Sequence, residues 1–255
     1  MSESNGSGLN PETLIDQMFE LWILPHIEAS NLAITRGEVT RALIVLHPRG
    51  VPEVMLNKQA ELIATVKVRD DVAEGELVTL GNVEGISDMH PAHIDPDAGW
   101  IAFAFIADGR GAVAFDFRYN RNRALALLDR ASDFMATARE ALIAGRTGPA
   151  VENALAAGEL AVTALTSLQN TTHKGRNSHS ARQSWLNMYA HNGNGQLDWY
   201  QAMRKLLQVR PFARYGDPQA SPLPSESELA DCLDHVNNLI EHVAQHAADH
   251  RAASS

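Results

Sequence analysis

The residue types best suited to chemistry in this chain are basic and lie between positions 173 and 215. Arginine guanidinium groups bind phosphate in a bidentate manner, and an aromatic ring can stack on a nucleobase. The set predicts a surface for nucleotide or RNA and comprises His173, Lys174, Arg176, His179, Arg182, Arg204, Arg210, Arg214 and Tyr215. The alternative is that these side chains form solvated helix faces or pair with acidic regions of the same chain. In that case His179 is a buried polar residue that orients its helix.

A second group combines imidazoles with carboxylates in one short stretch, at Asp88, His90, His93 and Asp95. Such ligands could hold Zn²⁺, Mn²⁺ or Fe²⁺ and leave positions open for a water nucleophile. Two nearby prolines and an irregular spacing favour a turn-rich loop instead. We therefore assign no metal site and expect no cofactor, and these four residues remain weak candidates.

Histidines also recur near the C-terminus, at His235, His242, His246 and His250. The last three are four residues apart, so on a helix they share one face and could chelate a divalent ion. Because they flank an apolar stripe, a solvated helix edge is the preferred interpretation.

Several classes of protein are disfavoured. The sequence has neither a Gly-x-Ser-x-Gly elbow nor a Walker-type phosphate loop. Its one cysteine, Cys232, excludes a disulfide scaffold and is predicted to lie in a core. The longest apolar run, 100–107, is far shorter than the roughly 20 residues of a membrane span. Because the first residues also lack the pattern of a signal peptide, we expect a cytoplasmic protein without membrane contact.

The net charge of −10 is unevenly distributed along the 255 residues. Counted from the sequence, residues 1–117 have a balance of −11, residues 118–214 of +7 and residues 215–255 of −6. A basic middle segment between acidic ends indicates an anionic partner.

The first part of the chain has the pattern of an α+β region, 1–117, after a disordered tail, 1–10. Asn10 and Pro11 predict the start of a helix that Pro25 limits. Alternating or continuous apolar runs then predict the strands of one small antiparallel sheet covered by that helix, at 41–46, 61–69, 76–80, 100–107 and 111–117.

From about residue 118 the apolar period becomes helical, and five helices are expected over 118–255. The first ends near Gly145, and Pro149 opens the second. The third spans about 178–190, and the fourth begins near Leu197 and contains Pro211, which makes its continuation less certain. Ser225 and Glu228 form a possible capping box for the last. The fold class is α+β, a sheet region followed by a five-helix bundle.

Residues within 131–215 resemble the HEPN family of all-α domains. The resemblance rests on the Ala/Phe/Ala spacing of 131–142, the small residues of 150–165, the segment from His173 to Arg182 and the Arg/Tyr end at 210–215. It implies a helical bundle, often dimeric, that binds nucleotide or RNA. Many members are metal-independent ribonucleases of toxin–antitoxin or phage-defence systems.

The resemblance also implies a catalytic arginine followed, after four to six residues, by a histidine. The only match here is Arg41 with His47, which lies outside the bundle. The first hypothesis is therefore a non-catalytic protein that binds nucleotide or RNA. It forms a homodimer through its alanine-rich helices. Its sheet region supplies specificity or a surface for a protein partner. The second is a divergent ribonuclease that uses Arg176, His179 and Arg182. The third is an interaction module whose acidic ends mask its basic bundle.

Overall fold

The chain divides into two compact units, Met1–Tyr119 and Asn120–Ser255. The computed structural model describes residues 10–69, 73, 75–78, 82–106, 109–170 and 179–248. The tail 1–9, with the predicted disorder, lies outside these ranges, as do His173, Lys174, Arg176 and His250. None of the described helices is both long and apolar enough to cross a membrane.

The first unit begins with the predicted helix, but this helix does not end at Pro25. Asn10 caps α1 (Pro11–Met18) by accepting a hydrogen bond from the Glu12 amide. A π-helical segment, Phe19–Ile23, then leads into α2 (Leu24–Ala29). Pro25 is the second residue of α2 and directly follows the π-helical segment, so the helix runs on past a residue that has no N–H to donate. The change of helix type therefore lets the chain continue past the proline.

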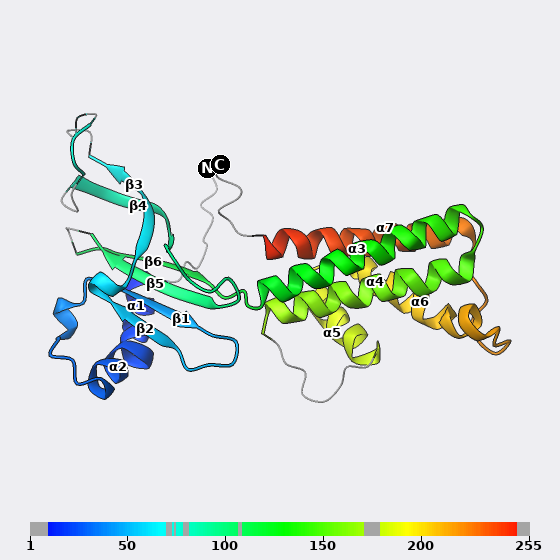
Figure 1. The fold of residues 1–255 in the computed structure, drawn as a ribbon, viewed down its shortest axis with the longest axis horizontal. Helices are drawn as coiled ribbons and strands as arrows, with labels where there is room; N and C mark the ends of the chain where they lie inside the picture. Colours follow the sequence, from blue (N-terminus) through cyan, green and yellow to red (C-terminus); the bar gives the residue numbers. More distant parts are fainter. Residues whose placement is uncertain are drawn as a thin grey trace, which may run out of the picture. The chain divides into compact units, whose positions relative to one another are not determined.

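A four-stranded antiparallel sheet with the order β2-β1-β5-β6 forms the centre of this unit (Figure 1). Its strands are β1 (Arg41–Leu46), β2 (Glu53–Leu56), β5 (Gly99–Phe105) and β6 (Gly111–Asp116). One face packs on the helices, where Phe19 contacts Phe103 with ring centroids 5.6 Å apart. The predicted packing of the helix on the sheet is confirmed.

The other face of this sheet carries a feature that the sequence pattern did not predict, a separate pair of strands. They are β3 (Leu62–Val68) and β4 (Val83–Pro91), and Met89 packs with Leu43 and Trp100 of the larger sheet. The prediction of a strand at 76–80 is wrong for residues 76–78, because these form no strand. Residues 79–80 lie outside the described residues. Strand β4 instead uses a mixed polar sequence because only one of its faces is covered.

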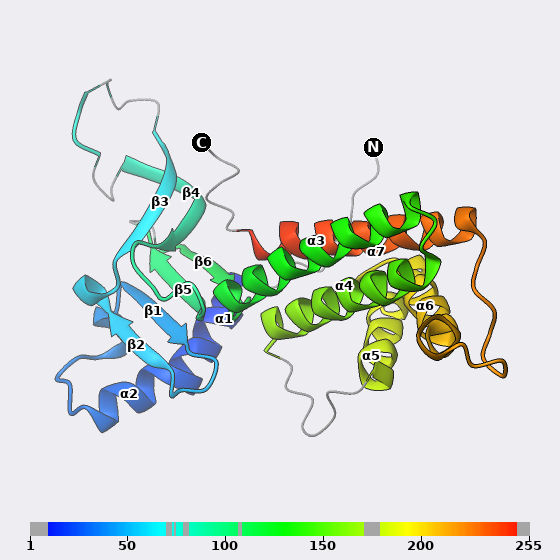
Figure 2. The same cartoon turned by 45° about the vertical axis from the view of Figure 1, so that its right-hand side comes forward.

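The second unit contains the five expected helices: α3 (Arg121–Ile143), α4 (Thr147–Leu168), α5 (His179–His191), α6 (Leu197–Tyr215) and α7 (Glu226–Ala247). Helices α3 and α4 form a long antiparallel pair (Figures 1 and 2). Gly145, with φ +67°, closes α3 as predicted, since this left-handed conformation favours glycine. Ser225 and Glu228 form the predicted capping box of α7.

Helix α4 is the centre of the bundle and contacts the four other helices. Its alanines at 150, 154, 157, 161 and 164 are fully buried within the unit. The alanines of α3 at 124, 131, 138 and 141 are also buried. These alanine faces are used for packing inside one chain, so the predicted dimer through the alanine-rich helices would need other faces of the helices. Small side chains let neighbouring helices approach closely in either situation, so the sequence does not distinguish them.

Candidate anion-binding site

The predicted basic residues that the structure brings together lie around two carboxylates of α4. Glu152 and Glu159 are the only charged residues of this 22-residue helix, and they are seven positions apart. Seven residues make nearly two helical turns, so both carboxylates lie on one face. Helices α5 and α6 contact α4 (Figures 1 and 2), and their basic side chains meet this face.

Glu152 holds two arginines of α6 with its two carboxylate oxygens. Arg210 donates from Nε to Oε1 at 3.1 Å. Arg214 places Nη1 3.8 Å from Oε2. Both arginines reach the same carboxylate because α6 continues through Pro211 and ends only at Tyr215, so Arg210 and Arg214 are one turn apart. The helix that Pro211 made less certain is therefore continuous in the structure.

Glu159 holds two residues of α5. Its Oε1 contacts Nδ1 of His179, and its Oε2 lies 3.7 Å from Nη1 of Arg182. Arg182 also donates from Nε to the hydroxyl of Thr163, one turn further along α4, at 3.2 Å. His179 and Arg182 are three residues apart and thus share one face of α5.

His179 links the group around Glu159 to the group around Glu152. Its Nε2 lies 3.1 Å from Nη1 of Arg210. Because arginine can only donate, Nε2 accepts, and the ring proton is then on Nδ1, from which it is donated to Glu159. In this geometry the Nε2 nitrogen is occupied by Arg210. We call the six residues Glu152, Glu159, His179, Arg182, Arg210 and Arg214 the arginine–glutamate cluster.

The cluster is accessible to solvent and keeps an excess of positive charge. The side chains of Arg214 and His179 are 48% and 44% exposed, whereas Glu159 is only 17% exposed. Three arginines face two glutamates. An anion from solvent can therefore reach cations whose positions are already set by the protein.

The remaining predicted binding residues lie outside this cluster. Arg204 is exposed on α6, six residues before Arg210 and thus on a different face, and it makes no ion pair or hydrogen bond among the described residues. Tyr215 is 75% exposed, and the guanidinium of Arg214 lies 5.5 Å from its ring centroid. The structure thus leaves an exposed aromatic ring beside the cluster.

Sequence reasoning missed the two glutamates. The alternative prediction was that the arginines pair with acidic residues near the ends of the chain. In the structure, the acidic residues that pair with the cluster arginines come from α4. One signal was available, because two glutamates seven residues apart interrupt an otherwise uncharged helix.

The weak metal candidates are not gathered into a site. Asp88 and His90 lie on β4, not in the expected loop, with His90 Nδ1 3.4 Å from Asp88 Oδ2. His93 and Asp95 follow the strand, and Asp95 accepts a hydrogen bond from the Asp97 amide. Within the described ranges, no group of three or more His, Cys, Asp or Glu side chains is placed to hold a metal ion.

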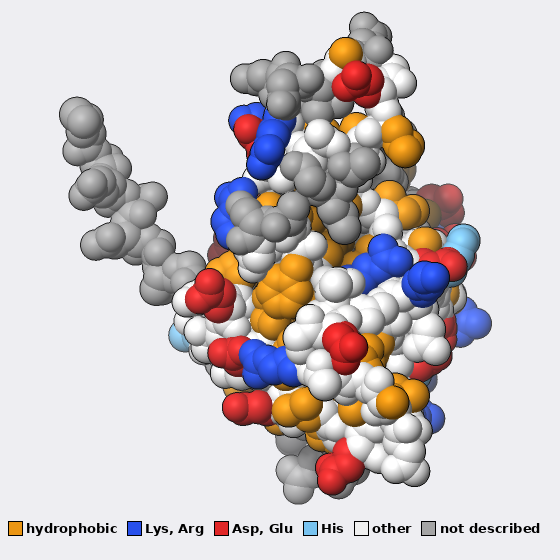
Figure 3. Space-filling model, turned by 90° about the vertical axis from the view of Figure 1, so that its left-hand side faces the viewer, with side chains coloured by type: hydrophobic (Ala, Val, Ile, Leu, Met, Phe, Trp, Pro, Cys, Tyr) orange, Lys and Arg blue, Asp and Glu red, His pale blue; other side chains and the backbone are white. Residues whose placement is uncertain are grey.

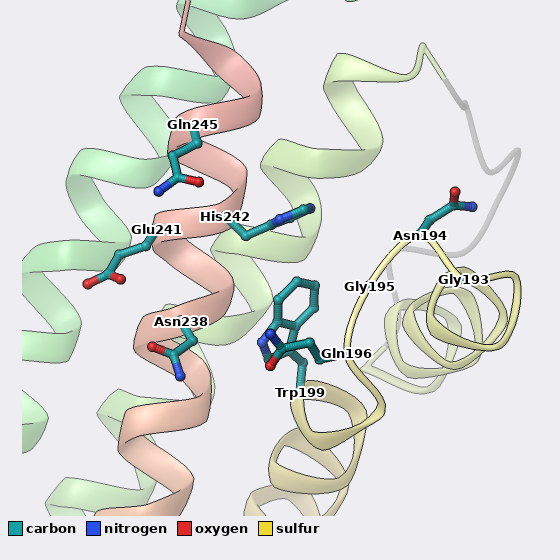
Figure 4. A pocket seen from close by; sticks show the side chains of 9 residues that line it. All are labelled: Gly193, Asn194, Gly195, Gln196, Trp199, Asn238, Glu241, His242 and Gln245. Carbon is teal, nitrogen blue, oxygen red and sulfur yellow. The ribbon is translucent and has the colours of Figure 1, made fainter. Parts of the chain in front are cut away.

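One of the α7 histidines, His242, borders a polar groove of about 550 Å³ between this helix and the start of α6 (Figure 4). The His242 ring packs beside Trp199, with centroids 4.8 Å apart, and burial lowers the pKa of this imidazole. Glu241 and Gln245 project away from the indole in Figure 4. No lysine or arginine lines the groove, so it lacks the cations of a phosphate site.

Figure 3 shows a face on which hydrophobic side chains are scattered among acidic and basic ones. Arg41 and His47, the one arginine–histidine pair with the ribonuclease spacing, have separate partners. Arg41 donates to the Asn57 carbonyl at 2.7 Å, and His47 lies 3.5 Å from Glu53.

The fold and the cluster define a helical bundle with a basic, partly exposed site. Residues 124–246 match the family model of the HEPN domain. The match runs from α3 to the end of α7, so the helical unit contains a HEPN domain at these residues. This family is related to nucleotides and RNA and is often found in toxin or defence systems. No curated protein matches the chain, and the first unit is assigned to no family.

Proposed function

We propose that the HEPN domain binds nucleotide or RNA through phosphate groups, with Arg182, Arg210 and Arg214 as the donors. The observation that supports this most strongly is the convergence of Arg210 and Arg214 on one anionic group, the Glu152 carboxylate. Carboxylate and phosphate are bound by the same arginine donors. Tyr215 beside Arg214 supplies a ring on which a base can stack.

We further propose that the site binds without cleaving. A general base needs a free nitrogen, whereas Arg210 occupies Nε2 of His179. The arginine and histidine with the ribonuclease spacing lie outside the helical unit. The protein then acts as a binding component of a toxin–antitoxin or phage-defence system, with the first unit as the surface for a protein partner.

One observation favours a second function, that of a divergent metal-independent ribonuclease. The Glu159 carboxylate contacts His179 Nδ1, which orients the imidazole in the way that a carboxylate orients a catalytic histidine. If a bound phosphate draws Arg210 away, Nε2 becomes free for acid–base chemistry.

Binding and cleavage can be followed together on one gel. The full chain, purified without a polyhistidine tag, is incubated with total RNA at low salt in metal-free buffer. Wild type should retard the RNA without shortening it. Arg210→Ala should weaken binding roughly tenfold, because it removes a charge-assisted hydrogen bond. The slope of log K against log salt should flatten by about 0.7 for each phosphate that the variant no longer neutralises.

A matched arginine controls for the general loss of positive charge. Arg139 lies on α3 and pairs with Asp234 at 3.6 Å, outside the cluster, so Arg139→Ala should bind like wild type. RNA cleavage that disappears in His179→Ala would select the ribonuclease. If wild type neither binds nor cleaves RNA, the cluster has only a structural role.

A further inference from the structure

The Glu152 carboxylate occupies the position beside Arg210 and Arg214 that an anionic ligand would need. Its two oxygens face Arg210 and Arg214, which come from successive turns of the same helix. A phosphate that used both arginines would need the same donors. The carboxylate and the phosphate would then repel each other at close range.

The backbone below Glu152 cannot move away to relieve this conflict. Its neighbours Ala150, Val151 and Ala154 are fully buried in the core of the unit. The carboxylate can leave the arginines by rotation of its own side chain, which is 30% exposed and so has solvent to turn into.

Glu159 differs in ways that fit a positioning role. Its side chain is more buried, at 17%, and it contacts a histidine and an arginine on α5. Arg182 keeps a second partner there, the Thr163 hydroxyl. Each of these interactions helps to hold the start of α5 on α4.

We propose that Glu152 is a built-in competitor, an internal anion that occupies the arginine pair and must be displaced when a phosphate of RNA binds. This inference rests on the proposed function. Glu152 weakens binding of the RNA backbone in the resting protein, and its removal exposes two arginines that are already in place.

The test uses the full chain and a short single-stranded RNA labelled with fluorescein, followed by fluorescence anisotropy. Glu152→Gln keeps the shape of the side chain and removes its charge. It should bind the RNA about two- to fivefold more tightly at low salt, the range expected for one partly exposed ion pair. Glu152→Ala should change affinity in the same direction, and thermal melts verify that both variants are folded.

Two further variants separate local competition from the change of net charge. Asp234→Asn also removes one negative charge from the bundle, at a residue that pairs with Arg139, and it should leave affinity unchanged. Adding Arg210→Ala to Glu152→Gln should abolish the gain, because the released arginine is then missing.

The outcomes for this inference and for the proposed function are distinct. Weaker or unchanged binding by both Glu152 variants, with wild-type binding still dependent on Arg210, would overturn the competitor and leave the binding function intact. Equal gains in Glu152→Gln and Asp234→Asn would also overturn it. If neither wild type nor Glu152→Gln binds RNA, both proposals fail.

Discussion

The arginine–glutamate cluster is a set of side chains that position one another more than they stabilise the fold. Its ion pairs are partly exposed, and such pairs contribute about 0–1 kcal/mol each. Removing Arg210 or Arg214 should therefore leave the folded unit intact, so a loss of RNA binding would report on the site itself. The same weakness means that the pairs can open when a stronger anion arrives.

A residue with a clear pH signature lies at the start of α7. Glu228 accepts hydrogen bonds from Lys205 Nζ at 2.8 Å and from the Ser225 amide and hydroxyl, and these lower its pKa from 4.5 to about 2. The lowered pKa means that the carboxylate favours the folded state above pH 4.5. This contribution is lost as the pH falls from about 4.5 towards 2.

We therefore expect Glu228→Gln to lower the Tm at pH 7, because the hydrogen bond with Lys205 is then no longer assisted by two charges. The Tm difference from wild type should shrink as the pH is lowered below 4.5, measured by circular dichroism melts. Glu226 is a carboxylate in the same first helical turn, and Glu226→Gln serves as the control. A difference that stays constant down to pH 3 would contradict this account.

At the scale of elements, α4 determines both the core and the site. Its alanines and Gly158 are buried, with Gly158 next to Met203 of α6, and its two glutamates pair with side chains of α5 and α6. Its position relative to α6 matters for the site, because α6 carries Arg210 and Arg214. Any change that separates α4 from α6 should therefore affect stability and RNA binding together.

Gly158 tests this coupling between the two helices. A Cβ at this position would overlap Sδ of Met203 on α6 and lie 3.5 Å from Val236 on α7. We expect Gly158→Val to destabilise the protein by about 1–3 kcal/mol through overpacking, as measured by urea denaturation. It should also weaken RNA binding.

The compensating change is Met203→Ala, which removes the overlapping atoms. Alone it should cost about 2–5 kcal/mol because it leaves a cavity. Combined with Gly158→Val, it should cost less than the sum of the two single variants. Additive costs would show that the two side chains do not share this space.

At the scale of the whole molecule, the chain combines two units, each with its own core. The helical unit buries a continuous cluster from Ala124 to Ala247, and the first unit buries residues on both faces of its sheet. We propose that the units are separate domains, close to the predicted division into 1–117 and 118–255. HEPN domains often dimerise, and we propose a homodimer here too, through a surface other than the buried alanines.

Residues 120–255 produced alone should therefore fold and unfold in one cooperative transition, because their core needs nothing from the first unit. Light scattering should give twice the calculated mass both for this fragment and for the full chain of 27.8 kDa. A fragment without a cooperative transition would contradict the domain division. A monomeric mass for the full chain would contradict the dimer.

Sequence and tertiary structure contributed different parts of this picture. Local signals were sufficient where the physical cause is local, such as the Asn10 cap, the Gly145 turn and the Ser225–Glu228 capping box. They were insufficient for β4, whose polar residues form a strand because its other face covers Leu43 and Trp100. The local signals also did not predict that the helix continues past Pro25, which depends on a change to π-helical geometry just before it.

The site follows the same division. The sequence by itself determined which side chains carry positive charge and that Arg210 and Arg214 can lie one turn apart. Only the tertiary structure decided that both meet Glu152 and that His179 lies between Glu159 and Arg210. The reason is that these interactions join residues at least 20 positions apart, so they exist only after α4, α5 and α6 have packed together.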